Sequence, residues 1–378
     1  MSGKFLKGLF SDIEAVPPIL QSSYYSSLDG LRGVAIIMVV LSHLNLPPAI
    51  YPLIFFNGHM GVLIFFVISG FLITTLCLKE KVLTKDISLK NFYIRRALRI
   101  FPVAYLYILV IIILNLVFKL SIPYMSILGA ALYLMNFTSY FRKYYYSWHT
   151  GHYWSLSVEE QFYLIVPFIL KKNFRLYLLL ILFIIFILPI FMCLQSIFPA
   201  LNVNVLYAFT HFLVKFQSIA IGCLFSVLMF KYPVDKDILT KNKVILNVLA
   251  IILILAIQYN DFLTLQSMFS GIAVSFLTGY IIVSNIVPTK DFLFKLLNSK
   301  ALKIVGVLSY SIYIWQEVFT SNDKKLPYFM ITFPYNVLCI ISVSCLSYYF
   351  YERFFLKLKT KFSKIKKTSQ QTPLVEVQ

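Results

Sequence analysis

The chain has 378 residues, of which 60% are hydrophobic and 13% are charged, and its mean hydropathy is +0.81. So little charge over so many long apolar runs excludes an ordinary soluble domain and indicates a helical membrane protein. The runs are continuous and not alternating, which argues against a membrane β-barrel. The net charge of +19 would indicate a nucleic-acid partner in a soluble chain. Here the basic residues lie between apolar runs, so we expect them to orient the chain in the membrane and expect no nucleic acid.

The first 23 residues hold a short apolar patch that is interrupted by charges and by Pro17 and Pro18, so we expect no cleavable signal peptide. All five cysteines fall in apolar segments and lack metal-type spacing. They are typical of buried packing residues, and we expect neither disulfides nor a metal site.

Ten apolar runs are long enough to cross a membrane as helices. They lie near residues 31–48, 57–78, 100–118, 155–170, 174–194, 205–230, 244–259, 262–287, 302–320 and 328–350. An eleventh run, residues 122–138, is shorter and contains Pro123, Gly129 and Asn136.

Charge bias decides whether residues 122–138 cross. If they do not, and the N-terminus is cytoplasmic, the inner segments hold 27 of the 34 lysines and arginines and the outer segments hold 5. If they did, every later basic loop would face outward, against the positive-inside rule. We therefore predict an all-α bundle of ten transmembrane helices with both termini inside and 122–138 re-entrant or interfacial. The expected domains are a cytoplasmic segment (1–24), a membrane domain (25–356) and a basic, polar tail (357–378).

The first span carries a charged start and a deep base. Asp29 and Arg32 precede an apolar stretch that leads to His43. At a rise of ~1.5 Å per residue, Arg32 and His43 lie roughly 16 Å apart along the helix axis. Ionisable groups at such depth persist mostly where they face a protein interior or a water-filled path. His43 is either a histidine bonded to a neighbouring helix or a general base or nucleophile.

Two further stretches stand out, one by its small residues and the other by its basic residues. The stretch 61–75 has two glycines, which we expect to allow close packing against the first span. Arg95, Arg96 and Arg99 lie within about one turn at the start of the third span. Basic residues commonly flank a span. Three arginines without a lysine also fit bidentate recognition of a phosphorylated ligand.

The stretch from Trp148 to Pro167 packs histidines, tryptophans and the pair Glu159 and Glu160 into what we expect to be the outer mouth of a span. Adjacent helical residues point about 100° apart, so the two carboxylates cannot serve one site equally. Ser157 with Glu160 also fits a helix capping box. The aromatic residues fit an interfacial belt or a platform that stacks on a sugar.

Two later spans are unusually polar. Residues 306–317 carry a stripe that includes Trp315, Gln316 and Glu317. The last span ends with Glu352 and Arg353, for which a local ion pair is the simpler interpretation.

Taken together, these motifs resemble the acyltransferase-3 family of integral membrane acyltransferases. The resemblance rests on LDGLRGVAIIMVVLSH, GVLIFFVISGFLIT, FYIRRALRIFP, WSLSVEEQFYLIVP, SYSIYIW and the terminal YERF, which are spread over residues 25–354. It implies a ten-span enzyme of the bacterial inner membrane that moves acetyl from cytosolic acetyl-CoA to a carbohydrate hydroxyl. The acceptors to expect are lipopolysaccharide O-antigen, capsule, exopolysaccharide or peptidoglycan. Membrane lipid surrounds such a protein, and an oligomer is compatible with it.

The resemblance also implies roles for single residues. His43 matches the essential histidine, and Arg32, Arg96 and Arg99, with help from Arg95, are expected to hold the CoA phosphates. Asp29 lies too far along the helix to orient His43, so Glu160 or Glu352 is the expected acid partner. The expected acceptor site contains Tyr153, Trp154, Ser157, Glu159, Trp315 and Gln316.

Two departures from the family pattern stand out. Gln316 occupies the place where many relatives have histidine, so we expect it to form hydrogen bonds and not to act as a base. Many relatives also carry a hydrolase-like domain after the last span, whereas the printed chain stops, so we expect it to finish the transfer itself or to hand the acetyl group to another protein.

Two other functions are compatible with parts of the sequence. A proton-coupled transporter would also have many spans and interior ionisable groups, but no inverted pair of broken spans is apparent. A scaffold protein would leave the charged motifs unexplained.

Overall fold

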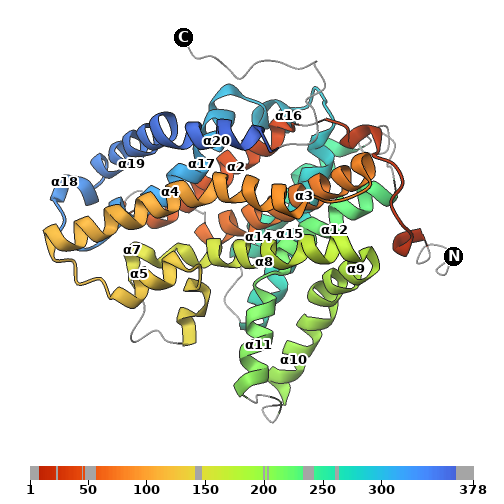
Figure 1. Ribbon diagram of the computed structural model, residues 1–378, viewed down its shortest axis with the longest axis horizontal. Coiled ribbons are helices and arrows are strands. Elements are labelled where there is room, and N and C mark those ends of the chain that lie inside the picture. The colour runs from red at the N-terminus through yellow and green to blue at the C-terminus, as the bar shows by residue number, and fades with distance from the viewer. Residues whose placement is uncertain are drawn as a thin grey trace.

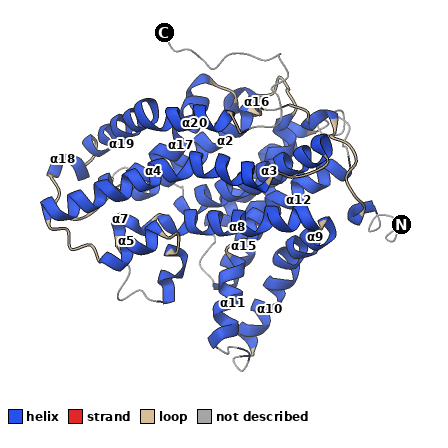
Figure 2. Ribbon diagram, in the orientation of Figure 1, coloured by secondary structure: helices blue, strands red, loops and turns tan. Residues whose placement is uncertain are grey.

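The computed structural model describes residues 8–22, 24–44, 46, 57–140, 147–198, 201, 204–232, 242–259 and 264–362. In this part of the chain every regular element is helical (Figure 2). The expected segments 1–24 and 357–378 lie partly outside the described residues.

The elements follow one another as η1 (Pro18–Leu20), α2 (Ser26–His43), α3 (Gly58–Thr84), α4 (Leu89–Phe118), α5 (Tyr124–Ala131), η3 (Met135–Tyr140), α7 (Trp148–Gly151), α8 (Tyr153–Lys172), α9 (Phe174–Leu182), η4 (Phe183–Ile187), α10 (Leu188–Ile197), α11 (Asn204–Val214), α12 (Gln217–Lys231), α14 (Lys243–Tyr259), α15 (Thr264–Ile286), α16 (Phe292–Leu297), α17 (Lys300–Phe319), α18 (Tyr328–Ile331), α19 (Tyr335–Leu346), η6 (Ser347–Glu352) and α20 (Arg353–Thr360).

Five helices in the described residues are long and apolar enough to cross a membrane, or six if the bent pair Leu206–Val214 and Gln217–Lys231 counts as one span. Each of the ten expected runs contains helix among its described residues, but several of these helices are short, broken or charged. The structure therefore confirms an all-helical membrane protein, whereas the ten-span count and the side of each terminus stay predictions. Residues 122–138 form the short helix α5 and the start of η3, neither of which is long enough to cross.

The first span begins earlier than its apolar run. Helix α2 covers residues 26–43, so Asp29 and Arg32 lie inside its first two turns and His43 is its last residue. The sequence placed the start near residue 31 because the polar residues before it do not look membrane-like. They are accommodated because the neighbouring helices bury Ser27 and Asp29.

The core of the bundle is formed by α2, α3, α12 and α17, with α2 in contact with α3 and α17 and α3 in contact with α12. Small residues permit this closeness. A side chain added at Gly61 of α3 would lie 2.5 Å from the Ala35 carbonyl oxygen of α2. One added at Gly306 of α17 would lie 1.7 Å from the Asp29 carbonyl oxygen. The expected packing of the stretch 61–75 against the first span is confirmed at Gly61, whereas Gly70 packs against Ile219 of α12.

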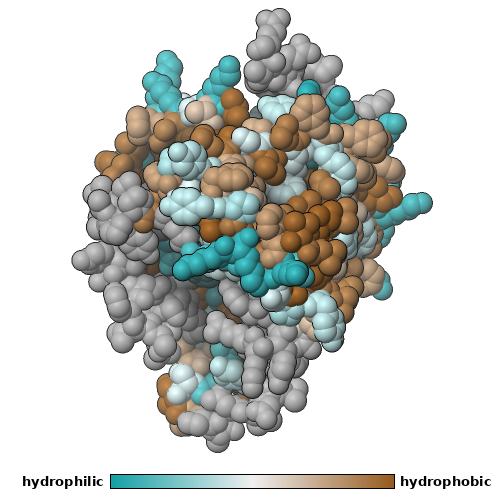
Figure 3. All heavy atoms as spheres, turned by 90° about the vertical axis from the view of Figure 1, so that its left-hand side faces the viewer, coloured by the Kyte–Doolittle hydropathy of each residue, from teal (hydrophilic) through white to brown (hydrophobic). Residues whose placement is uncertain are grey.

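Other helices extend away from this core. Helices α10 and α11 contact each other and project together from the bundle (Figure 1). Helix α4 ends and α18 begins at the left-hand end of the same view. The face at that end shows hydrophilic atoms among hydrophobic ones (Figure 3). There Lys325 Nζ donates to the Lys119 carbonyl oxygen at 2.6 Å.

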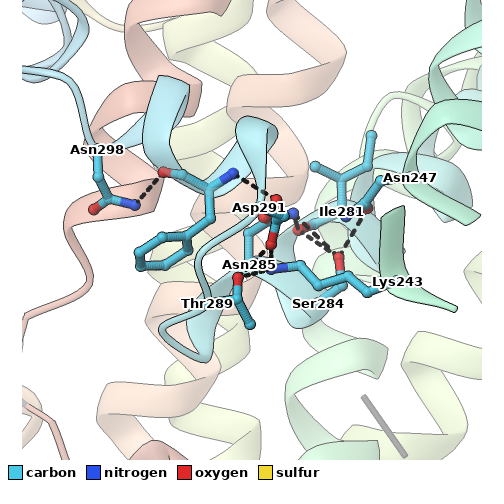
Figure 4. A network of polar contacts seen from close by, with 9 residues as sticks. Lys243, Asn247, Ile281, Ser284, Asn285, Thr289, Asp291 and Asn298 are labelled. Carbon is cyan, nitrogen blue, oxygen red and sulfur yellow. Dashed lines mark hydrogen bonds and ion pairs between the residues drawn. The ribbon is translucent and has the colours of Figure 1, made fainter. Parts of the chain in front are cut away.

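A polar network fixes the connection between α15 and α16 (Figure 4). Lys243 Nζ lies 2.8 Å from Asp291 Oδ2, and the Phe294 N–H donates to Asp291 Oδ1 at 2.9 Å. Burial alone would raise the pKa of Asp291, but the hydrogen bonds from Lys243, Thr289 and Phe294 outweigh that effect and lower the pKa to about 2. Asn298, after α16, in turn accepts a hydrogen bond from Ser26, so the network also anchors the start of α2.

Candidate active site

Two cavities adjoin along the bundle. We call the first the arginine chamber. It is lined by Arg32, Val62, Phe65, Phe66, Ile68, Ser69, Arg96, Arg99, Ile100, Ser155, Leu156, Glu159, Ser309, Tyr310 and Tyr313. We call the second the histidine chamber. Its empty volume is about 1050 Å³, part of it open to solvent, and it is lined by Val39, Ser42, His43, Asn57, Gly58, His59, Val62, Trp148, Gly151, His152, Trp154, Tyr313 and Glu317.

The same helices supply both chambers in the same direction along their axes. Helix α2 places Arg32 in one chamber and His43 in the other, eleven residues and roughly 16 Å apart. Helix α17 likewise places Ser309 in the arginine chamber and Glu317 in the histidine chamber. The chambers therefore succeed one another along the bundle.

Val62 and Tyr313 line both chambers and form the wall between them. The Tyr313 hydroxyl donates to the His152 carbonyl oxygen at 3.0 Å and shares a hydrogen bond with Ser155 Oγ at 2.5 Å. Since Ser155 lines the arginine chamber and His152 the histidine chamber, Tyr313 is fixed to both sides of the wall.

The three clustered arginines have different surroundings. Arg95 Nη2 lies 3.1 Å from Glu80 Oε2 and its Nη1 donates to the Phe362 carbonyl oxygen, so Arg95 points away from the chamber. Adjacent helical residues diverge by about 100°, which separates Arg95 from Arg96. The expected help of Arg95 in phosphate binding therefore finds no support in the geometry.

Arg96 is held by carboxylates. Its Nη2 lies 3.3 Å from Glu159 Oε2, and its Nε lies 3.3 Å from Glu160 Oε1. Its guanidinium also lies 3.8 Å from the centre of the Tyr163 ring, a cation–π contact. Both carboxylates thus bind one arginine at the same distance, so the expectation that they cannot serve one site equally is wrong.

Arg99 differs from both neighbours. It lines the arginine chamber, and it makes no hydrogen bond or ion pair within 4 Å with any residue that the structure describes. Arg32, which lines the same chamber, pairs with Asp29 at 2.8 Å. A largely buried cation without a close carboxylate is a favourable place for an anionic ligand.

His43 has a defined tautomer. Its Nδ1 lies 2.9 Å from the Val39 carbonyl oxygen, which can only accept, so Nδ1 carries the proton. Nε2 is therefore the basic nitrogen. The ring lies edge-on to Trp148, with 5.6 Å between the ring centres. This hydrogen bond within the helix leaves Nε2 to act on a substrate.

The carboxylates expected beside His43 lie elsewhere. Glu160 pairs with Arg96, and Glu352 Oε2 accepts a hydrogen bond from Ser311 Oγ at 2.6 Å. Glu160 is eight residues beyond His152, or ~12 Å along α8, which puts it past the wall. The carboxylate in the histidine chamber is Glu317, whose Oε1 lies 3.9 Å from His152 Nδ1.

Trp154 is the one member of the predicted acceptor site that lines the histidine chamber, where it stacks on His59 with 6.3 Å between the ring centres. Tyr153 is fully buried and its hydroxyl donates to the Ala104 carbonyl oxygen at 2.7 Å. Ser157 lies inside α8, where it accepts from the Met135 N–H and donates to the Tyr153 carbonyl oxygen, so the capping-box interpretation is wrong.

The remaining predicted residues of the acceptor site, Trp315 and Gln316, do not line the histidine chamber. Trp315 packs edge-on against Tyr107, and Gln316 is fully buried. Neither Gln316 side-chain atom has a hydrogen-bond partner among the described residues, so the expected hydrogen bond is not seen there. Both residues belong to the faces of α17 that point away from the histidine chamber, whereas Glu317, one residue on, reaches it.

His152, His59 and Glu317 were missed as site residues, although His152 and Glu317 belong to stretches that the sequence had singled out, 148–167 and 306–317. Ionisable side chains at membrane depth were the available signal. Among the described residues no group of three His, Cys, Asp or Glu side chains is arranged to hold a metal ion.

Comparison with known proteins identifies the family. The model of the acyltransferase domain family matches residues 25–352. O-acetyltransferase OatA of Staphylococcus aureus is 29% identical over 330 residues, which cover 80% of this chain and 52% of the relative. Peptidoglycan O-acetyltransferase OatA of Listeria monocytogenes is 30% identical over 315 residues, with 77% and 49% covered. The chain thus spans about half the length of these curated relatives.

No solved structure matches the chain. The match over residues 25–352 does not favour a transporter, and together with the apolar helices it makes the chain a multi-pass membrane protein. The chain belongs to the acyltransferase-3 family, as its motifs predicted.

Proposed function

We propose that the chain is a membrane O-acetyltransferase that moves an acetyl group from acetyl-CoA to a hydroxyl of a cell-surface carbohydrate. The observation that carries the proposal is the pair of adjoining chambers, one lined by three arginines and the other by His43, with Tyr313 and Val62 between them. The family match and the O-acetyltransferase relatives support the reaction class.

The arginine chamber is the proposed site of the donor's phosphates. Arg99 supplies a cation with no close carboxylate among the described residues, and Arg32 supplies a second cation at the same chamber. Arginine binds phosphate through paired N–H donors. In this proposal Arg96 acts mainly by holding Glu159 and Glu160, which keeps the wall of the chamber in place.

The histidine chamber is the proposed site of transfer. His43 Nε2 takes the proton of the acceptor hydroxyl while the oxygen attacks the thioester carbonyl carbon. A carbon–oxygen bond forms, the carbon–sulfur bond breaks, and the CoA sulfur leaves and receives the proton from His43. Nε2 is available for this role because Nδ1 is bound to the Val39 carbonyl oxygen.

The proposal includes ten spans with both termini on the cytoplasmic side, so that the arginine chamber takes acetyl-CoA from the cytosol. The charge bias of the loops supports this orientation. Peptidoglycan is the first acceptor to test, because the Listeria relative is named for that substrate. Capsule, exopolysaccharide and O-antigen glycans are the further acceptors.

The test uses the purified full chain in lipid nanodiscs with acetyl-labelled acetyl-CoA and soluble glycan fragments of peptidoglycan. We expect label in the glycan as an alkali-labile ester and release of an equal amount of CoA. Panels of capsule and lipopolysaccharide fragments test the other acceptors. Failure to form an ester with any of them, together with uptake of a labelled substrate into proteoliposomes, would overturn the proposal in favour of transport.

A further inference from the structure

The histidine chamber contains polar groups that the proposed chemistry of His43 does not use. His152 is 3% exposed and Glu317 is 4% exposed, and both line the chamber. Neither imidazole nitrogen of His152 has a hydrogen-bond partner among the described residues, and the same holds for the indole Nε1 of Trp148. Buried polar atoms normally have partners. Three of the fourteen unpartnered buried atoms among the described residues belong to residues that line this cavity, where a ligand could supply the missing partners.

These groups form a mixed set of donors and acceptors. The Glu317 carboxylate accepts hydrogen bonds, the Trp148 indole donates one, and a neutral His152 ring offers one of each. Glu317 Oε1 and His152 Nδ1 are 3.9 Å apart, too far for a hydrogen bond but close enough to bind the same small group. A hydroxyl both donates and accepts, so a compound with several hydroxyls fits this set better than an anion does.

An aromatic surface adjoins the polar groups. Trp154 stacks nearly parallel to His59 at the chamber, and Trp148 lies edge-on to His43. Sugar rings present apolar faces with hydroxyls at their edges. The chamber therefore offers an aromatic face and a polar edge together.

We propose that His152, Glu317 and the Trp148 indole bind the hydroxyls of the acceptor sugar that neighbour the one acetylated at His43. This inference rests on the proposed function and names the residues that recognise its acceptor. Glu317 accepts a hydrogen bond from one neighbouring hydroxyl, and Trp148 and His152 complete the contacts. The acceptor class is an uncharged part of a glycan with at least two hydroxyls within reach of each other.

The first experiment measures both substrates with the full chain in nanodiscs. Glu317→Gln keeps the volume of the side chain but replaces an accepting oxygen with a donating amide. We expect the KM for peptidoglycan glycan fragments to rise about 10-fold, the effect of losing one hydrogen bond. The KM for acetyl-CoA should stay unchanged because Glu317 lies outside the arginine chamber.

Ser344→Ala is the control, since Ser344 is also fully buried and its hydroxyl has no partner among the described residues, but it lines neither chamber. It should leave both KM values unchanged. The melting temperature of each variant shows whether it is folded.

The second experiment does not depend on how a variant folds. The wild-type chain is assayed with fragments that each lack one hydroxyl next to the acetylated position. The fragment that lacks the hydroxyl bound by Glu317 should react poorly with the wild type and equally poorly with Glu317→Gln, because both changes remove one contact. Fully additive losses, or an unchanged acceptor KM in folded Glu317→Gln, would overturn the inference while acetyl transfer by the wild type would leave the proposed function intact.

Discussion

The two chambers differ in how their polar groups are paired. In the arginine chamber, Arg96 is bound by two carboxylates and Arg32 by one, which leaves Arg99 as the cation without a close partner among the described residues. In the histidine chamber, His43 has one hydrogen bond within its own helix, whereas neither ring nitrogen of His152 has a hydrogen-bond partner among the described residues. At these two cavities the groups without a partner, Arg99 and His152, are therefore the first candidates for ligand binding.

The largest expected effect tests the histidine chamber. His43→Ala should lower the rate of acetyl transfer by about 10²- to 10⁴-fold, because it removes the proposed general base. Stability should change little, since the His43 side chain donates its hydrogen bond to the Val39 carbonyl oxygen of its own helix. The rate is measured as ester formed, and membrane insertion and melting temperature are the controls. A folded variant with the wild-type rate would show that the chamber does not carry the chemistry.

The arginine chamber is tested first through stability. Arg96→Gln leaves Glu159 and Glu160 without their cation in a largely buried place, which is expected to cost about 3–5 kcal/mol. The loss should appear as a lower melting temperature and poor recovery from membranes. The double variant with Glu159→Gln should recover part of that stability. If Arg96→Gln were as stable as the wild type and only the acetyl-CoA KM rose, Arg96 would belong with Arg99 as a ligand-binding group.

Arg99→Gln should have the opposite pattern. It removes no ion pair with a described residue, and the repulsion from Arg32 and Arg96 that it relieves is larger than the attraction to Glu352 and Asp29 that it loses. We therefore expect normal or improved stability, and a rise of about 10- to 100-fold in the KM for acetyl-CoA through the loss of a charge-assisted contact to phosphate. The KM for the glycan should not move. A stability loss without a change in KM would refute the distinction between paired and unpaired arginines.

The sequence predicted some of this arrangement and missed the rest for a clear reason. Apolar run length predicted the helices, and the motifs predicted the family. His43, Arg32, Arg96 and Arg99, which the motifs singled out, line the two chambers, whereas Arg95 does not. Helical spacing gives the depth of a residue and not its direction relative to other helices. Glu160 and Glu352 were therefore expected beside His43 although Glu317 lines its chamber, and Tyr153, which is fully buried, looked like its neighbour Trp154. Only the packing of α2, α3, α8 and α17 separates them.

The smallest expected effect concerns the pH dependence of donor binding. Lys359 lies on α20, after the last predicted span, and is half-buried. Burial, followed by the positive charges of Arg99, Arg96, Arg32 and Arg95, lowers its pKa to about 7. Its charge is therefore largely absent above pH 7 in the folded chain, whereas an unfolded chain keeps it up to about its ordinary pKa of 10.5. Below pH 7 Lys359 is protonated in the folded chain and is repelled by the arginines. It therefore destabilises the fold most below pH 7, and this effect disappears as the pH rises from about 7 to 10.5.

An anionic donor reverses that penalty, because it interacts favourably with the protonated amine. The KM for acetyl-CoA should therefore fall by up to about 10-fold between pH 8 and pH 6. Lys359→Met should remove the pH dependence of the KM for acetyl-CoA, whereas the pH dependence of kcat that His43 causes should remain. Lys357→Met is the matched control, because Lys357 lies on the same helix but is exposed, and it should leave the profile of the wild type. An identical slope in all three proteins would mean that Lys359 does not sense the donor, and the arginine chamber would then owe its affinity to Arg99 and Arg32 alone.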